Sequence, residues 1–383
     1  MTITVVWVQV PLRVHLKMAH NYLFTVIFLL VASAVGFAQP TANYPANLEQ
    51  LHLNVWNEII NGPIENDTIQ SLCNRIDDQG SWRNIDYTDK DRGSWEPALH
   101  LGYTLAISKA WQKTGTVFYH NPNLLKSIHK ALNYWLDNDF QCPNWWYNKI
   151  DVPAQLAFIL ILMENELSQE QMARGIKILN RSTISMTGQN KVWLSGNVLL
   201  KSLLQRDSVM SGRAAQSIRD ELKVSINEGI QPDGAFHQHG PQIQFGDYGL
   251  AFVDDMIKWI RVLRNTPFCF DENKMTILRN YLLEGQQWIT WKNQVDISAC
   301  GRQLFKGEQR RKARRLADYI FEMETLDPKF AKTYKRAGKY FTLGGNKHFW
   351  RSDFQVQRAP HYYFSVKMCS ERVVGTETVN AEN

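Results

Sequence analysis

The chain has 383 residues, a length that suits one large domain or two to three smaller ones. Its apolar content of 44% and charged content of 21% are those of a globular protein and exclude a disordered chain. The net charge of +6 favours anionic partners, and thirteen Trp, fourteen Tyr and eighteen Phe suit a cleft that stacks sugar rings, although large helical cores also use Trp.

Residues 1–38 have the pattern of a secretory signal peptide. Residues 23–35 form a mostly apolar run after a basic segment, and small residues follow it as a cleavage site requires. The run is too short for a stable transmembrane span. Met18 is an alternative start, since the segment before it lengthens the basic region beyond need. We therefore expect a mature chain from about Gln39, exported to the periplasm or beyond, with no membrane span.

Residues 39–345 are expected to form one helical domain. A Ser168–Gln171 capping box and an early Pro153 mark two helix starts. The segment 154–163 is apolar on nearly every side, which predicts a helix buried all round. Further helices are expected at 95–112, 124–135, 192–205, 214–228, 249–263 and 274–290. About ten helices without a fixed repeat indicate helical hairpins stacked into a ring or bundle.

Residues 346–383 are expected to begin a β domain that is incomplete in this chain. Apolar residues alternate with polar ones from Tyr362 to Met368, which predicts a strand. Phe354 and Val356 suggest an earlier strand, with a turn near Arg358-Ala-Pro360. So few strands do not form a stable sheet alone.

The stretch 233–249 is the strongest candidate for chemistry. It holds two His, one Tyr, four Gly and one Pro between two predicted helices. Repeated Gly and a Gly-Pro pair favour a loop with polar side chains in fixed places, although a partly buried polar turn is an equal alternative. His237 and His239 have a spacing that can bind a metal, but no third ligand is evident.

Four further clusters are candidates, each with a structural alternative. Asn144-Trp145-Trp146 can bind sugar or pack in the core, and Thr187-Gly-Gln-Asn190 can bind ligand or form a turn. Arg302 can act in a site or belong to a solvated basic face, and the segment 377–383 can bind ligand or be a polar terminus.

Several other classes of chemistry are absent from the sequence. There is no GxSxG, P-loop or Rossmann motif, and the five Cys lack CxxC spacing. The basic run 302–315 has seven Lys or Arg against one Glu, but no nucleic-acid-binding motif accompanies it. We therefore expect no nucleic-acid partner.

Taken together and in this order, these clusters resemble the polysaccharide lyase family of chondroitin AC, hyaluronate and xanthan lyases. The resemblance runs from about residue 48 to the end of the chain. It includes Asn-Trp-Trp, Thr-Gly-Gln-Asn, Asp-Gly-Ala-Phe-His-Gln-His-Gly-Pro-Gln with a later Tyr-Gly, Gly-Arg, and the final Glu-Thr-Val-Asn. The His-Gly-Pro-Gln wording is most similar to the chondroitin AC branch.

The resemblance implies an incomplete α/α toroid followed by the first strands of an antiparallel β domain, with a sugar chain in a cleft along the toroid. The matching catalytic residues are His239, Tyr248, Arg302, Glu377 and Asn190, and the matching substrate-binding residues are Asn144, Trp145, Trp146, Lys306 and Asn380. At Lys306 the family usually has a second Arg, so the planar fork that binds carboxylate or sulfate is lost there.

These residue types suit β-elimination from a uronic acid. Asn190 and His239 can hydrogen-bond the uronate carboxylate as negative charge develops on it. Tyr248 can take the C5 proton as a phenolate and return one to the leaving oxygen. A phenol ionises near pH ~10, so a nearby Arg302, oriented by Glu377, would help it ionise.

The expected function is cleavage of chondroitin sulfate, with hyaluronan as a second candidate substrate, by a monomer that needs no cofactor. A structural metal ion is left open by the sequence. Two alternatives remain. One is a catalytically impaired relative that binds anionic polysaccharide, and the other is an α/α-barrel glycoside hydrolase, which needs two carboxylates about 5–10 Å apart.

Overall fold

A computed structural model of the chain describes residues 44–340 and 343–375. The expected signal peptide, Glu377 and Asn380 lie outside these residues. Among the described helices, none is both long and apolar enough to cross a membrane. All five cysteine thiols are free.

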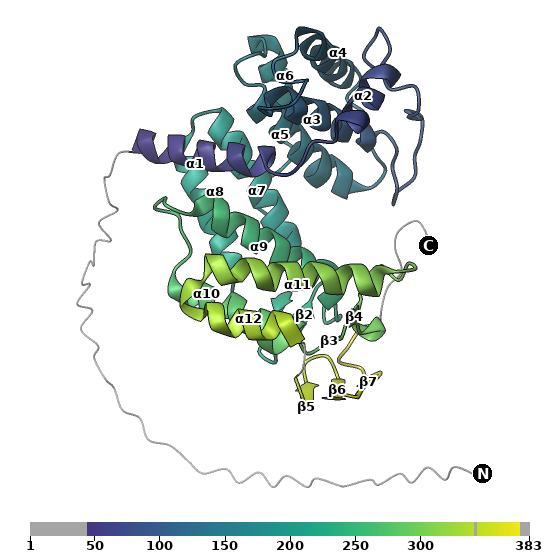
Figure 1. Ribbon diagram of the computed structural model, residues 1–383, viewed down its shortest axis with the longest axis vertical. Helices are drawn as coiled ribbons and strands as arrows, with labels where there is room; N and C mark the ends of the chain where they lie inside the picture. Colours follow the sequence, from purple (N-terminus) through teal and green to yellow (C-terminus); the bar gives the residue numbers. More distant parts are fainter. Residues whose placement is uncertain (1–43, 341–342, 376–383) are drawn as a thin grey trace, which may run out of the picture. The chain divides into compact units, whose positions relative to one another are not determined.

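The described chain is mainly helical (Figure 1). Its α-helices are α1 Tyr44–Ile60, α2 Asn66–Arg75, α3 Ala98–Gln112, α4 Pro122–Asn138, α5 Val152–Leu162, α6 Gln169–Leu179, α7 Gly188–Leu204, α8 Ser208–Glu221, α9 Leu250–Leu263, α10 Glu272–Asn280, α11 Glu308–Leu326 and α12 Ala331–Tyr340. Wider π-helical turns are η1 Tyr147–Asp151, η2 Phe245–Gly249 and η3 Tyr281–Gln286, and short 3₁₀ turns are η4 Ile297–Ala299 and η5 Pro328–Phe330.

The helices pack as two layers of hairpins. Among the odd-numbered helices, α3 contacts α5, α5 contacts α7, α7 contacts α9 and α9 contacts α11. Helices α3, α5, α7 and α11 each also pack on the helix that follows them. Helix α1 packs on α9, α5 and α3. Figure 1 shows several of these pairs, such as α11 beside α12. The expectation of a mainly α fold of stacked hairpins is confirmed.

The sequence explains which helices are inner. Helix α5 reads VPAQLAFILIL and buries residues on nearly every side, as its apolar composition predicts, because it has α3 on one side and α7 on the other. Helix α6 is amphipathic and buries only one face. Its predicted capping box is present, with Ser168 and Gln171 bonding each other's backbone N–H.

Two predicted helices were too long. The helix expected at 214–228 ends at Glu221, because the chain then turns into β1 Gly229–Ile230, which pairs with β2 Phe236–His237. The helix expected at 274–290 changes to the π-helical turn η3 after Asn280, and β3 Thr290–Trp291 pairs with β4 Gln294–Val295. In the first case turns and an isolated bridge of Val224 to Ile230 replace the end of the expected helix, and in the second a wider helical turn replaces it.

The C-terminal strands form an antiparallel sheet in the order β5 Gly345–Phe349, β6 Phe354–Ala359, β7 Tyr362–Lys367. The strands predicted from alternation are present. The turn expected near Arg358 was placed too early, since β6 continues through Ala359, and β5 was not predicted.

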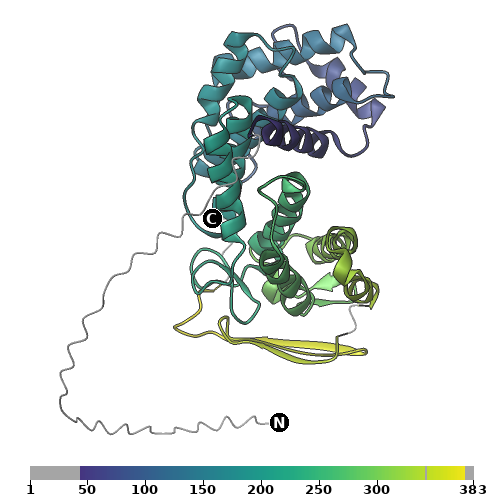
Figure 2. The same ribbon diagram turned by 90° about the vertical axis from the view of Figure 1, so that its left-hand side faces the viewer.

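The helical domain supplies the packing that this small sheet lacks by itself. The buried Arg358 donates hydrogen bonds of 2.8 Å to the carbonyls of Gln287 and Thr290. Nε2 of the buried His237 lies 2.8 Å from Oγ of Ser352. Figure 2 shows the sheet (yellow) lying along the helices that follow residue 230 (green).

Candidate active site

Tyr248 and Arg302 are brought together although they lie on different segments. Tyr248 is in the π-helical turn η2, directly before α9, and its side chain is buried. Arg302 Nη2 donates a 2.7 Å hydrogen bond to the Tyr248 phenol oxygen, and Arg302 Nε lies 3.3 Å from Oδ2 of Asp247. The structure therefore holds a guanidinium at the phenol, with a neighbouring carboxylate to orient it.

Gly301 permits this approach. Its φ is +73°, and a Cβ at this position would lie 2.6 Å from both Asp247 Cβ and Gln244 Oε1. A side chain would therefore push apart the two segments that carry Tyr248 and Arg302.

His239 also packs against Tyr248. The imidazole meets the phenol ring edge-on, with ring centroids 4.9 Å apart and an interplanar angle of 65°. Its backbone has a φ of +60°, the left-handed region that non-glycine residues seldom adopt. His239 and Arg302 thus both lie against Tyr248, and the three residues form one cluster.

The two histidines of the loop have different partners. His237 packs toward the small sheet at Ser352, and burial together with Arg351 and Lys367 lowers its pKa to about 4. Within a strand, residues two apart would share a face. Strand β2 ends at His237, so His239 is no longer held on the face of His237 and packs against Tyr248 instead. Within the described ranges, no group of three His, Cys, Asp or Glu is placed to hold a metal ion.

A row of aromatic side chains leads to the phenol. Trp146 contacts Trp193 at 5.8 Å between ring centroids, and Trp193 contacts Tyr248 at 6.0 Å. A cavity of about 440 Å³ has both Trp146 and Trp193 in its lining. Trp145 does not join this row, and 40% of its surface is exposed.

Trp193 was missed by the sequence analysis. It lies three residues after Asn190 on α7, so the two share a helix face, and this spacing was the available signal. Asp247 was also missed, although it directly precedes Tyr248.

Asn190 lies in the first turn of α7 and is buried, with 7% of its surface exposed. Its Oδ1 atom has no hydrogen-bond partner among the described residues. Buried polar groups are normally paired, so this oxygen, one helical turn from Trp193, is able to accept a hydrogen bond from a ligand hydroxyl. Helix N-termini also favour anionic ligands.

Asn144 and Lys306 are placed differently from the cluster. Asn144 Nδ2 donates to the Arg92 carbonyl at 2.8 Å, and its Oδ1 accepts from the Trp146 N–H at 3.0 Å. Its amide therefore holds Trp146 in place. Lys306 lies in an exposed turn and makes no hydrogen bond or ion pair with the residues that the structure describes.

The last described residues run beside the His239 loop. The Val374 N–H donates to the Pro241 carbonyl at 3.1 Å, and Gln242 Nε2 donates to the Gly375 carbonyl at 2.5 Å. Glu377 and Asn380 follow shortly after in the sequence, outside the described range, so their roles stay predictions.

The basic run 302–315 does not form one solvated face. Lys312 is buried and donates to the carbonyls of Cys300 and Gln303 at 2.8 and 3.3 Å, and burial lowers its pKa. Arg315 lies 3.3 Å from Asp254. These cations have separate structural partners, and Arg302 alone of them reaches Tyr248 in the described contacts.

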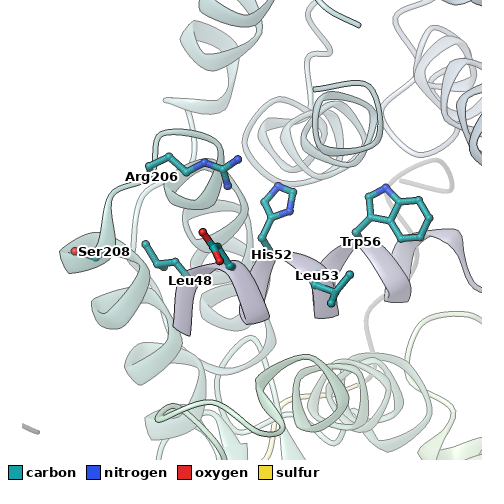
Figure 3. Close-up of a pocket in the computed structure, with 7 residues that line it drawn as sticks. Leu48, His52, Leu53, Trp56, Arg206 and Ser208 are labelled. Atoms are coloured by element: carbon teal, nitrogen blue, oxygen red, sulfur yellow. The ribbon is translucent and has the colours of Figure 1, made fainter. Parts of the chain in front are cut away.

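A larger cavity of about 820 Å³ lies elsewhere, along α1 (Figure 3). Figure 3 shows His52, Trp56 and Arg206 around it. His52 and Arg206 in its lining already share a partner, because Glu164 lies 3.0 Å from His52 and 2.9 Å from Arg206. None of the predicted site residues lines it, so it is not the candidate site.

Two family models match the chain. The N-terminal alpha-helical domain of polysaccharide lyase family 8 matches residues 62–337, and the super-sandwich domain of the same family matches residues 344–383. Together they cover most of the sequence, on both sides of the boundary between the helices and the sheet.

Similar sequences include the chondroitinase-AC of Pedobacter heparinus, 26% identical over 373 residues, which are 94% of this chain and 53% of that relative. A hyaluronate lyase of Enterococcus faecalis is 20% identical over 345 residues, covering 72% of this chain and 34% of the relative. The chain thus spans about half the length of the chondroitinase.

Solved structures share the fold. A chondroitinase AC lyase in complex with oligosaccharides superposes with a TM-score of 0.77 at 24% identity, over 85% of this chain and 51% of that one. A Paenibacillus xanthan lyase superposes with a TM-score of 0.68 at 17% identity, over 88% and 38%. The fold is that of these lyases, which confirms the expected α/α toroid followed by the first strands of a sheet.

Proposed function

The chain belongs to polysaccharide lyase family 8, and we propose that it cleaves uronic-acid-containing glycosaminoglycans by β-elimination. Chondroitin sulfate is the first candidate substrate and hyaluronan the second, by analogy with a chondroitinase and a hyaluronate lyase among its relatives. A net charge of +6 suits a polyanionic substrate.

Tyr248 is the proposed base and acid. As a phenolate it removes the proton from C5 of the uronate, the C–H electrons form the C4–C5 double bond, and the C4–O4 bond breaks. The proton on Tyr248 then passes to the leaving O4, which regenerates the phenolate. Atoms and electrons balance in this step without an oxidant or a water molecule.

Arg302 is proposed to favour the phenolate. Its Nη2 atom lies 2.7 Å from the phenol oxygen, and a cation at that distance stabilises a negative charge. Asp247, 3.3 Å from Arg302 Nε, keeps the guanidinium oriented. Glu377, by its place in the family motif, is proposed to assist in the same way.

Asn190 and His239 are proposed to bind the uronate carboxylate. Charge grows on that carboxylate as the C5 proton leaves, so fixed donors beside it stabilise the transition state more than the ground state. The side-chain NH₂ of Asn190, in the first turn of α7, and the imidazole of His239 beside Tyr248 are the described groups that can donate to it.

The aromatic row is proposed to bind the sugar rings that flank the uronate. The ring of Trp146 contacts the ring of Trp193, which in turn contacts Tyr248. The C–H faces of sugars pack well on such aromatic surfaces. Trp145 and Lys306, both exposed, are proposed to contact the chain further from the bond that breaks, and Asn380 follows by its motif.

The observation that carries the proposal is the Tyr248–Arg302 hydrogen bond in contact with His239. Two carboxylates contact this cluster or its loop in the described residues, and both are already bonded, Asp247 to Arg302 and Glu228 to the loop backbone. A glycosidase would need two carboxylates facing the substrate across the cleft, so elimination is favoured over hydrolysis.

The test is ultraviolet absorbance of the chain incubated separately with chondroitin sulfate, hyaluronan and xanthan. Elimination leaves an unsaturated uronate, a conjugated chromophore that hydrolysis does not make. We expect absorbance to rise with chondroitin sulfate and its rate to fall by more than about 1,000-fold in Tyr248→Phe. Binding without absorbance would favour the polysaccharide-binding alternative, and new reducing ends without absorbance would favour a hydrolase.

A further inference from the structure

Glu228 joins the start of helix α7, which carries Asn190, to the loop that carries His239. Its Oε1 atom accepts from the backbone N–H groups of His239 and Gly240, at 2.7 and 3.3 Å. Its Oε2 atom accepts from Gln238 Nε2 at 2.6 Å and from the hydroxyl of Thr187. One carboxylate thus joins two segments that are far apart in the sequence.

Gln238 extends this contact to the residue next to Asn190. Its Oε1 atom accepts from the Gln189 backbone N–H at 3.0 Å, which fixes the side-chain amide with its NH₂ group toward Glu228. Gly188 lies against the same oxygen, since a Cβ there would approach it to 2.3 Å. The chain of contacts therefore runs from Glu228 through Gln238 to the start of α7.

The strand pairing explains why Glu228 and Gln238 meet. Gly229 is paired with His237 in the β1–β2 ladder, so the next positions outward are Glu228 and Gln238. Beyond them His239 adopts its left-handed φ of +60°, a conformation that persists only where the surroundings hold it. The bonds from its own N–H and from the Gly240 N–H to one carboxylate supply that constraint.

We propose that Glu228 is a positioning residue that sets the separation of Asn190 and His239, the two groups assigned above to the uronate carboxylate. This inference rests on the proposed function for its catalytic consequence. Glu228 acts through Gln238 and the backbone of the His239 loop, and it takes no part in proton transfer.

The test exchanges donor and acceptor between the two side chains. Glu228→Gln places an amide NH₂ against the NH₂ of Gln238. The Gln238 amide is held in this orientation because its oxygen accepts from the Gln189 backbone N–H. Gln238→Glu places two carboxylates face to face. The double variant Glu228→Gln with Gln238→Glu restores one donor and one acceptor, and the amide introduced at position 228 keeps an oxygen for the loop N–H groups.

We expect each single variant to lower kcat on chondroitin sulfate by about 10- to 100-fold with a smaller change in KM, because the misplaced groups act mainly on the transition state. The double variant is expected to regain kcat to within about threefold of the parent chain, a strong positive coupling. Asn227→Ala, a neighbour whose side chain makes none of these contacts, is the control and keeps parental kcat.

A second readout does not depend on catalysis. Hydrogen–deuterium exchange of the segments 187–191 and 236–242 is expected to accelerate in both single variants and to return to the parental rate in the double variant. This result would support the positioning role even if the chain released no unsaturated product. Unchanged exchange and kcat in Glu228→Gln, or a double variant as impaired as its two singles combined, would overturn the proposal.

Discussion

At the scale of single residues, Trp193 has a position that a substitution can test, because its ring lies between Trp146 and Tyr248. Trp193→Ala removes that ring, so KM for chondroitin sulfate should rise by about 10-fold, in line with the ~1–1.5 kcal/mol of an aromatic contact. Trp193→Phe should recover most of this loss. Steady-state kinetics measures both, and Trp350→Ala, at an exposed Trp between β5 and β6, serves as control. Equal KM values for Trp193→Ala and the parent would remove Trp193 from the sugar platform.

Asp151, beside the cavity that Trp146 lines, offers a test of stability against pH. Burial raises its pKa from 3.8 to about 6, although Gln155 donates to it at 2.8 Å. A raised folded pKa means that its contribution to stability is present below pH 3.8 and is lost as the pH rises through 6.

Asp151→Asn keeps the Gln155 bond without the buried charge. It should therefore stabilise the chain by about 3 kcal/mol at pH 7.5 and by little at pH 4. Urea unfolding at the two pH values measures the difference. Asp318→Asn, at an exposed position, is the control, and a gain that does not depend on pH would show that the Asp151 carboxyl is not the cause.

The polar members of the site were more readily predicted than its apolar walls. His239, Tyr248 and Arg302 stand in unusual motifs, and the structure places both His239 and Arg302 against Tyr248. Trp193 and Glu228 have ordinary local sequences, and their significance depends on which segments meet in three dimensions. A motif indicates chemistry within one segment, whereas the role of Trp193 or Glu228 depends on the distant segment that it contacts.

At the scale of elements, helical periodicity predicted well which segments are helices, but it predicted the ends of those helices less well. The helices near α3, α4, α7 and α9 were placed within a few residues, and the buried α5 was recognised from its composition. Errors occurred where the chain turned before a strand, as before β1, and where a helix changed to a wide π-helical turn, as at η3. These outcomes depend on contacts with distant segments, which local pattern does not contain.

The docking of the small sheet should depend on pH through His237. Its pKa is lowered to about 4 by burial and by Arg351 and Lys367, so its stabilising contribution is present above pH 6.5 and is lost as the pH falls toward 4. Between pH 7.5 and 4.5 the parent chain should lose about 3 kcal/mol that His237→Gln does not lose. Denaturant unfolding at both pH values measures this, with exposed His348→Gln as control. Parallel pH profiles for the parent and His237→Gln would contradict the assignment.

At the scale of the whole molecule, the order of helical domain followed by sheet was predicted from the change of period near residue 345. The way in which the sheet is held was not predicted. Polar contacts hold the sheet on the helical domain. Arg358 donates to the carbonyls after η3, and Tyr363 donates to Asp296 at 2.7 Å. Buried cations and phenols are rarely assigned to a core from sequence, because their position there depends on finding partners.

The sheet and the site are also connected. His237 packs on the sheet while His239, two residues later, packs on Tyr248, so the segment that orients the imidazole of the site is anchored by the small sheet. The family match on both sides of residue 344 is consistent with such a joint role for helices and sheet.

The most direct test of the central claim is the mass of the products formed from chondroitin sulfate in water labelled with heavy oxygen. β-Elimination by Tyr248 predicts oligosaccharides with an unsaturated uronate end that are one water lighter than hydrolysis products and carry no heavy oxygen. These products should be absent with Tyr248→Phe. Saturated products carrying one heavy oxygen at the new reducing end would contradict the account.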